Sequence, residues 1–138
     1  LLAVEVNKDG LWVNDQLQRM GYQNLYFREF IDDITKSTNK YFGWRTDRKT
    51  RDVMLSELKH QFMMRSEWPE ELLKEMMTFV RNARGKPEAA SGKHDDQVIA
   101  AAIAYEVVKQ RFGTESNPMV VEKDKTFMEA IFASGVAW

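Results

Sequence analysis

The stretch SGKHDDQVIAAAIAYEVVKQ, from Ser91 to Gln110, places a histidine and two adjacent aspartates directly before an alanine-rich apolar run. The spacing of the apolar residues predicts a helix from Asp96 to Phe112, which Gly113 ends. The small residues of VIAAAIA let this helix pack closely against a sheet. We therefore expect a buried helix with two carboxylates at its N-terminus, near the edge of the core.

Asp95 and Asp96 have two interpretations. One aspartate at the first turn of a helix is explained as a cap, because its side chain accepts hydrogen bonds from free backbone N–H groups. A second carboxylate beside it lacks that explanation, and a buried carboxylate needs a cation or a proton to compensate its charge. The pair therefore either caps the helix or binds a divalent metal. His94 is either a surface group or a residue that orients a metal ligand or water.

The opening residues LLAVEVN predict a short buried strand that carries one acid, Glu5. A helix from Leu11 to Met20 ended by Gly21, and then a second strand at NLYF, complete a strand–helix–strand pattern typical of a parallel α/β unit. Ligands bind at the C-terminal ends of strands in open α/β sheets. Glu5 and the aspartate pair are therefore candidate oxygen ligands for Mg²⁺ or Mn²⁺.

The middle of the chain mixes basic and aromatic residues. We expect a hairpin or a partly ordered excursion within residues 28–51, with Gly43 at its centre, and then helices over 52–64 and 70–79. The linker 81–93 has room for a short strand, and a last short helix is expected around 127–132. Basic side chains neutralise phosphates without reading sequence, so this region is either a DNA contact or a solvated hairpin over tucked aromatics. The candidate DNA-binding residues are Lys40, Arg45, Arg48, Lys49 and Arg51.

Composition sets broad limits. The 138 residues suffice for one domain, and 43% apolar and 30% charged residues are typical of a soluble globular protein. A net charge of −1 disfavours a dedicated nucleic-acid-binding domain, which is often basic. The absence of cysteine excludes disulfide scaffolds and thiolate metal sites and is compatible with a reducing cytosol. No apolar run is long enough to span a membrane, and no signal peptide is visible. Because the chain opens on Leu1 inside a strand pattern, we expect a fragment of a longer protein.

Three motifs carry a resemblance to a known family. VEVNKDG (Val4–Gly10), GWRTDRKTR (Gly43–Arg51) and GKPEAASGKHDDQVIAAAIA (Gly85–Ala104) resemble, in order and spacing, the C-terminal nuclease domain of the large terminase subunit of tailed bacteriophages. The resemblance covers Leu1 to about Phe112. It implies an RNase H-like mixed sheet flanked by helices, without its first strand or strands. Residues 1–138 then form a single partial nuclease domain, with 113–138 as a C-terminal extension.

The resemblance also implies a function. Members of the family cut concatemeric double-stranded viral DNA during genome packaging in the host cytoplasm, with two metal ions held by three acidic positions. Glu5 matches the second position and the aspartate pair the third, with Asp96 favoured over Asp95. The first acid, on an earlier strand, has no counterpart here, so the fragment alone has a doubtful activity. The implied partners are DNA, other terminase subunits, the portal and a second copy of the chain.

Two alternatives to a nuclease stay open. In the first, the chain is a non-catalytic interaction module of a packaging motor, and its acids are structural. In the second, it is a small α/β protein in which Asp95 and Asp96 only cap a helix.

Overall fold

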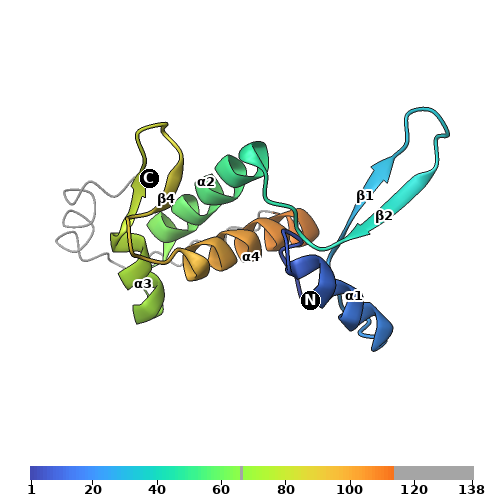
Figure 1. Cartoon of the computed structure of the whole chain (residues 1–138), viewed down its shortest axis with the longest axis horizontal. Coiled ribbons are helices and arrows are strands. Elements are labelled where there is room, and N and C mark those ends of the chain that lie inside the picture. The colour runs from blue at the N-terminus through green and yellow to red at the C-terminus, as the bar shows by residue number, and fades with distance from the viewer. Residues whose placement is uncertain (66, 114–138) are drawn as a thin grey trace. The chain divides into compact units, whose positions relative to one another are not determined.

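A computed structural model describes residues 1–65 and 67–113 of the chain (Figure 1). The described part is mixed α and β, as predicted, with four helices and two separate two-stranded antiparallel sheets. The elements in chain order are α1 (Gly10–Arg19), β1 (Phe27–Ile31), β2 (Thr38–Phe42), α2 (Arg48–Met64), α3 (Glu70–Met77), β3 (Phe79–Arg81), β4 (Pro87–Ala89) and α4 (Asp96–Phe112). They belong to two compact units, Leu1–Asp52 and Val53–Trp138.

The first unit opens with a segment that makes parallel bridges on either side of the hairpin, where a buried strand was predicted. That prediction is wrong in part, because LLAVEVN forms isolated bridges rather than a strand, and Leu1 and Leu2 are exposed. The backbone N–H of Leu2 donates to the carbonyl of Asn24 at 2.8 Å, and that of Tyr26 donates to the carbonyl of Leu2 at 2.8 Å. These bonds form a parallel bridge between Leu2 and Leu25, with α1 in the connection between the two strands. Gly21, at φ +73°, follows the last turn of α1, as the sequence predicted.

A second parallel bridge joins Glu5 to Trp44, just beyond the β1–β2 hairpin. The N–H of Trp44 donates to the carbonyl of Val4, and the N–H of Val6 donates to the carbonyl of Trp44, both at 2.7 Å. Trp44 is buried beside Tyr26, with ring centroids 6.1 Å apart. The hairpin between these bridges pairs Phe27–Ile31 with Thr38–Phe42. The hairpin prediction is thus confirmed.

The position expected for Gly43 was wrong. It lies at the base of the hairpin, and the tip is formed by residues 32–37, where Asp32 accepts hydrogen bonds from the N–H groups of Ile34 and Thr35. Gly43 has φ +90° and directs the chain from β2 into the bridge at Trp44.

The second unit contains most of α2 and all of α3 and α4. The apolar side predicted for α2 is confirmed, because Met54, Leu55, Leu58 and Phe62 are all buried. α4 has the predicted bounds and buries residues that include Val98, Ala102, Ile103 and Val107. α3 ends two residues earlier than predicted, because Phe79 begins β3.

The linker after α3 contains a complete hairpin, since β3 pairs with β4 in antiparallel fashion. Gly113, at φ +76°, ends α4 as expected. The helix expected at 127–132 and the remainder of the C-terminal extension lie outside the described residues. No helix within residues 1–65 and 67–113 combines the length and apolar character needed to cross a membrane.

An ion pair joins α2 to α4 inside the second unit. Lys109 Nζ donates to Glu57 Oε2 at 2.7 Å, and Gln61 Nε2 donates to Glu57 Oε1 at 2.9 Å. Burial raises the pKa of Glu57, but the hydrogen bonds from Lys109 and Gln61 outweigh it, so its pKa lies below the ordinary value of 4.5. The same hydrogen bond raises the pKa of Lys109 above 10.5.

This pair predicts a pH-dependent stability. Because the pKa of Glu57 is lowered on folding, its contribution is complete well above pH 4.5 and is lost as the pH falls through the folded-state value below it. Because folding raises the pKa of Lys109, its contribution to stability is complete below pH 10.5 and is lost only above that pH. We expect Glu57→Gln to lower the free energy of unfolding near neutral pH by about 1 kcal/mol, because the lysine side of the pair is partly solvated. Urea titrations across the acidic range would show this difference shrinking as the pH falls below 4.5.

Glu70→Gln is the matched control. Glu70 forms an ion pair with Lys74 at 2.6 Å on the surface of α3, with 75% of the glutamate side chain exposed. Such a pair contributes little, so this variant should follow the wild type at every pH. A constant difference between Glu57→Gln and wild type across the acidic range would contradict the assignment to the ionised carboxylate.

Candidate functional site

The N-terminus of α4 is capped by a residue that sequence reasoning did not identify. Glu75 of α3, 22 residues from Gln97 in the chain, accepts from the N–H of Gln97 at 2.7 Å and from the N–H of Val98 at 3.2 Å. Asp95 stands at the N-cap position but makes no side-chain cap hydrogen bond. A carboxylate at this position is stabilised by free N–H groups and by the helix dipole. Asp95 therefore does not supply a capping hydrogen bond, which comes from Glu75, while Asp96 stays the acidic residue in the first turn of α4.

The two aspartates differ in exposure. Asp95 is half-buried, while 88% of the Asp96 side chain is exposed, with one carboxylate oxygen 3.8 Å from Nδ1 of His94. His94 is itself exposed. The sequence-based expectation of carboxylates near the core edge fits Asp95 and is wrong for Asp96, because α4 turns its apolar residues inward from Val98 and leaves its first residues in solvent. Asp96 and His94 are thus accessible to a ligand from solution.

Glu5 lies in the first unit, at the parallel bridge to Trp44 near the C-terminal end of the opening segment. It is half-buried, and its Oε1 accepts a hydrogen bond from Asn7 Nδ2 at 3.2 Å. The same amide nitrogen lies 3.1 Å from the carbonyl oxygen of Thr46. Asn7 therefore orients the Glu5 carboxylate and ties it to the segment that follows Trp44.

The predicted metal ligands come from both units, with Glu5 in the first and the aspartate pair in the second. Neither Glu5 by itself nor the aspartate pair by itself supplies the three acidic positions that the resemblance implies. No group of three or more histidine, aspartate or glutamate side chains suited to a metal occurs among residues 1–65 and 67–113. Carboxylate oxygens nevertheless suit Mg²⁺ and Mn²⁺, and Mg²⁺ typically takes one or two protein carboxylates together with water and phosphate.

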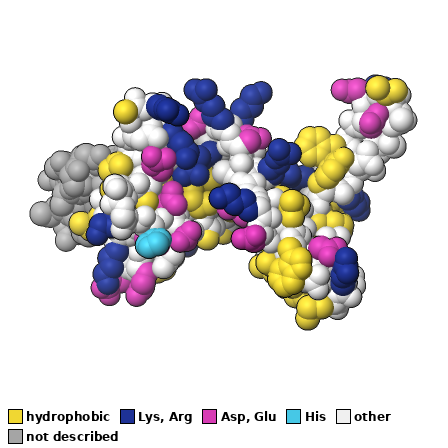
Figure 2. Space-filling model, in the orientation of Figure 1, with side chains coloured by type: hydrophobic (Ala, Val, Ile, Leu, Met, Phe, Trp, Pro, Cys, Tyr) yellow, Lys and Arg dark blue, Asp and Glu magenta, His cyan; other side chains and the backbone are white. Residues whose placement is uncertain are grey.

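The candidate DNA-binding residues lie in the middle of β2, in the loop after it and at the start of α2. Lys40 lies on β2, with its Nζ 4.5 Å from the ring centroid of Phe27 and 3.7 Å from Glu29. Arg45 is exposed in the loop that leads to α2. The other three, Arg48, Lys49 and Arg51, lie in the first turns of α2. Figure 2 shows Lys and Arg side chains over α2 on the face in view.

A capping box positions the start of α2. Asp47 Oδ1 accepts from the N–H of Lys49 at 2.9 Å and of Thr50 at 3.0 Å, and the N–H of Asp47 donates to Thr50 Oγ1 at 2.7 Å. The backbone hydrogen bond from Thr50 is the main cause that lowers the pKa of Asp47. Thr50 Oγ1 also donates to the carbonyl of Arg45 at 3.0 Å. The segment GWRTDRKT is therefore a constrained turn that presents its basic side chains to solvent.

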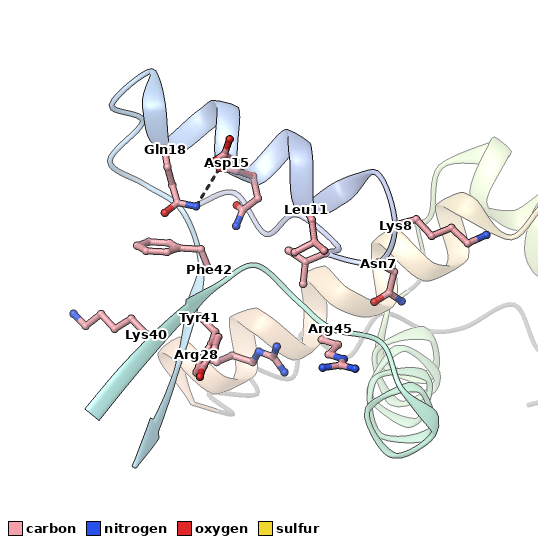
Figure 3. Close-up of a pocket in the computed structure, with 12 residues that line it drawn as sticks. Asn7, Lys8, Leu11, Asp15, Gln18, Arg28, Lys40, Tyr41, Phe42 and Arg45 are labelled. Carbon is pink, nitrogen blue, oxygen red and sulfur yellow. Dashed lines mark hydrogen bonds between the residues drawn. The ribbon is translucent and has the colours of Figure 1, made fainter. Parts of the chain in front are cut away.

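A pocket of about 680 Å³ lies within the first unit, between α1 and the hairpin (Figure 3). Its lining includes two of the predicted DNA-binding residues, Lys40 and Arg45. It also includes Arg28, which lies directly across from Tyr41 in the register of the hairpin. Arg28 escaped sequence reasoning because it stands 12 residues before Lys40, the first residue of the basic cluster. The pairing of β1 with β2 brings it back to that cluster.

Comparison with known proteins returned no match: no family model, no curated protein and no solved structure matches the chain. A function for the chain therefore rests on its own side chains and on the motifs quoted above.

Proposed function

We propose that the chain is a metal-dependent DNA endonuclease domain of the terminase type, with an RNase H-like fold, that cleaves concatemeric double-stranded phage DNA in the host cytoplasm. One observation carries the proposal. Glu75 accepts the N–H groups of Gln97 and Val98, and Asp95 makes no side-chain cap hydrogen bond, so capping hydrogen bonds do not account for two aspartates at this helix start. The carboxylate of Asp96 is 88% exposed beside His94, and carboxylate oxygens of this kind are suited to a hard divalent cation.

The position of Glu5 adds support. It lies in an extended opening segment that makes isolated parallel bridges to Leu25 and, at Glu5 itself, to Trp44. Functional residues of α/β proteins concentrate at the C-terminal ends of parallel strands. The parallel bridges also agree with the mixed sheet of an RNase H-like fold, which is the finer fold assignment that we propose.

In this function Glu5 of the first unit and Asp95 and Asp96 of the second are each oxygen ligands for Mg²⁺ or Mn²⁺. A pair of such ions activates water and stabilises the leaving oxygen in phosphodiester hydrolysis. His94, 3.8 Å from Asp96, orients that carboxylate or the attacking water. The basic residues of β2, of the loop after it and of the start of α2 neutralise DNA phosphates and hold the duplex without reading its sequence.

Manganese binding tests the proposal most directly. We expect calorimetry to detect Mn²⁺ binding by the wild-type chain, and the Asp96→Asn or Glu5→Gln substitution to weaken it by at least about tenfold, because each removes an anionic ligand. Mn²⁺ is the probe because oxygen donors bind it more tightly than Mg²⁺ in most sites.

Glu75→Gln is the matched control for this experiment. Glu75 is an acid beside the same helix N-terminus, but both of its N–H partners belong to α4. We expect this variant to lose about 1 kcal/mol of stability and to bind Mn²⁺ like the wild type. Absence of Mn²⁺ binding in a folded wild-type sample, or equal losses in the Glu75 and Asp96 variants, would refute the metal site.

A second candidate function, an interaction module of the packaging motor, has one observation in its favour. Large apolar side chains are exposed on and just after α1, including Leu11 (61%), Trp12 (66%) and Met20 (80%) (Figure 2). Apolar side chains that gather on a surface mark contact with another protein. Other terminase subunits, the portal or a second copy would then cover α1, and the chain would not cleave DNA.

A further inference from the structure

A single side-chain amide, that of Asn7, links Glu5 to the turn that leads into α2. Its Nδ2 lies 3.2 Å from Glu5 Oε1 and 3.1 Å from the carbonyl oxygen of Thr46, which is 39 residues away in the chain. An amide nitrogen carries two hydrogens, so it can donate one to each of these oxygens at the same time. The orientation of the Asn7 side chain therefore depends on both segments.

The backbone around Asn7 holds this side chain in place. The carbonyl of Asn7 accepts from the N–H of Gly10 at 3.2 Å, at the start of α1. Gly10 lies so close to the opening segment that an added Cβ would collide with the carbonyl oxygen of Glu5. Glu5 is itself held by the parallel bridge to Trp44. The contact between Asn7 and Glu5 is therefore set by the backbone as well as by the two side chains.

The carbonyl of Thr46 belongs to the turn that presents the basic residues. Thr50 Oγ1 donates to the carbonyl of Arg45 at 3.0 Å and accepts from the N–H of Asp47 at 2.7 Å. Thr46 lies between these two residues in the chain, so these hydrogen bonds also restrain its carbonyl. A movement of the turn is therefore transmitted to the Asn7 amide.

Asn7 engages only one of the two carboxylate oxygens of Glu5. Within the described part of the chain, the other oxygen, Oε2, has no hydrogen-bond partner. Carboxylates that bind metal ions are themselves hydrogen-bonded, and these bonds fix the oxygen that the cation meets. The arrangement at Glu5 has this form.

We infer that Asn7 is a positioning residue, which presents Glu5 Oε2 to the divalent cation and couples that cation to the turn that carries Arg45. The inference deepens the proposed function and rests on it, because it takes Glu5 as a metal ligand. Coupling between two sites is reciprocal. A bound cation therefore orders the turn, and a DNA phosphate that orders the turn strengthens cation binding.

Calorimetry with Mn²⁺ tests the positioning role. We expect Asn7→Ala to weaken Mn²⁺ binding by about tenfold, the lower end of the effect for a residue that supports a metal ligand. In the Glu5→Gln background the same substitution should cause no further loss, because Asn7 acts through the Glu5 carboxylate. A general disturbance of the fold would instead add its loss in that background.

Hydrogen exchange followed by mass spectrometry tests the coupling. The amides of Asp47, Lys49 and Thr50 are the hydrogen-bonded donors of the turn. In the wild type, saturating Mn²⁺ should slow their exchange by about 2- to 10-fold, the factor that one hydrogen bond supports. In Asn7→Ala, Mn²⁺ should leave their exchange unchanged.

Gln23→Ala is the matched control for both measurements. Gln23 is exposed, and its Nε2 donates to the carbonyl of Gly21 at 3.0 Å, so this variant also removes an exposed amide donor from the first unit. It should bind Mn²⁺ like the wild type and show the same protection of the turn.

Three results would overturn the inference. They are equal Mn²⁺ affinity in Asn7→Ala and the wild type, a full additional loss in the double variant, and protection of the turn that persists in Asn7→Ala. Failure of the proposed function gives a different result. Either the wild type binds no Mn²⁺, which overturns both, or it binds Mn²⁺ with the dependence on Asn7 intact and cleaves no DNA.

Discussion

Replacing Gly43 with alanine should destabilise the first unit by about 2–5 kcal/mol, the sum of a left-handed backbone penalty and an overpacked contact. Gly43 has φ +90°, which alanine rarely adopts. A Cβ at this position would also collide with the Val6 side chain and with the carbonyl oxygen of Val4. That carbonyl accepts the hydrogen bond of the parallel bridge at Trp44, so the collision cannot be relieved without breaking the bridge.

Urea unfolding followed by circular dichroism would measure this loss. Amide hydrogen exchange would locate it, because the N–H groups of Val6 and Trp44 are the donors in the bridge. Both amides should exchange far faster in Gly43→Ala than in the wild type.

Gly85→Ala is the control for the backbone penalty alone. Gly85 has φ +72°, but apart from its two chain neighbours no described residue would lie within 4 Å of an added Cβ. We expect a loss of about 1–2 kcal/mol and unchanged exchange at Val6 and Trp44. Equal losses in the two glycine variants would show that the close approach of the opening strand to Gly43 does not constrain this position.

Replacing Asp96 with asparagine should reduce Mn²⁺-dependent cleavage of plasmid DNA by at least about 100-fold. Loss of a residue that only supports a metal ligand costs about 10- to 100-fold in activity, and loss of the ligand itself should cost more. The substitution removes one negative charge and keeps the size of the side chain. Since 88% of the Asp96 side chain is exposed and it does not cap α4, the fold should be unaffected. Conversion of supercoiled to nicked and linear plasmid, followed on gels, measures the rate.

Two controls accompany the cleavage assay. Glu75→Gln should cleave at nearly the wild-type rate at a temperature well below its unfolding midpoint, because Glu75 acts only on the backbone of α4. Glu5→Gln should lose activity as Asp96→Asn does. Full activity in Asp96→Asn would refute its role as ligand.

Local signals predicted much of the fold. The apolar spacing of α4 and the glycine after it predicted both of its ends, and Met54, Leu55, Leu58 and Phe62 identified the buried side of α2. The strand–helix–strand pattern predicted the parallel bridge at Leu25. These predictions succeeded because periodicity, capping and turn chemistry act between residues that are close in the chain.

The candidate site was only partly predictable, because its decisive contacts join residues that are distant in the chain. The sequence by itself determined the helix that begins at Asp96, the acid in the opening strand and the basic turn after Gly43. Only the tertiary structure decided that Glu75 caps α4, that the Asn7 amide reaches the carbonyl of Thr46, and that Gly43 lies against the opening strand. A free N–H group bonds to whichever acceptor the packing brings near it, and a close contact forms wherever packing brings two segments together. Packing depends on the whole unit rather than on residues that are neighbours in the chain.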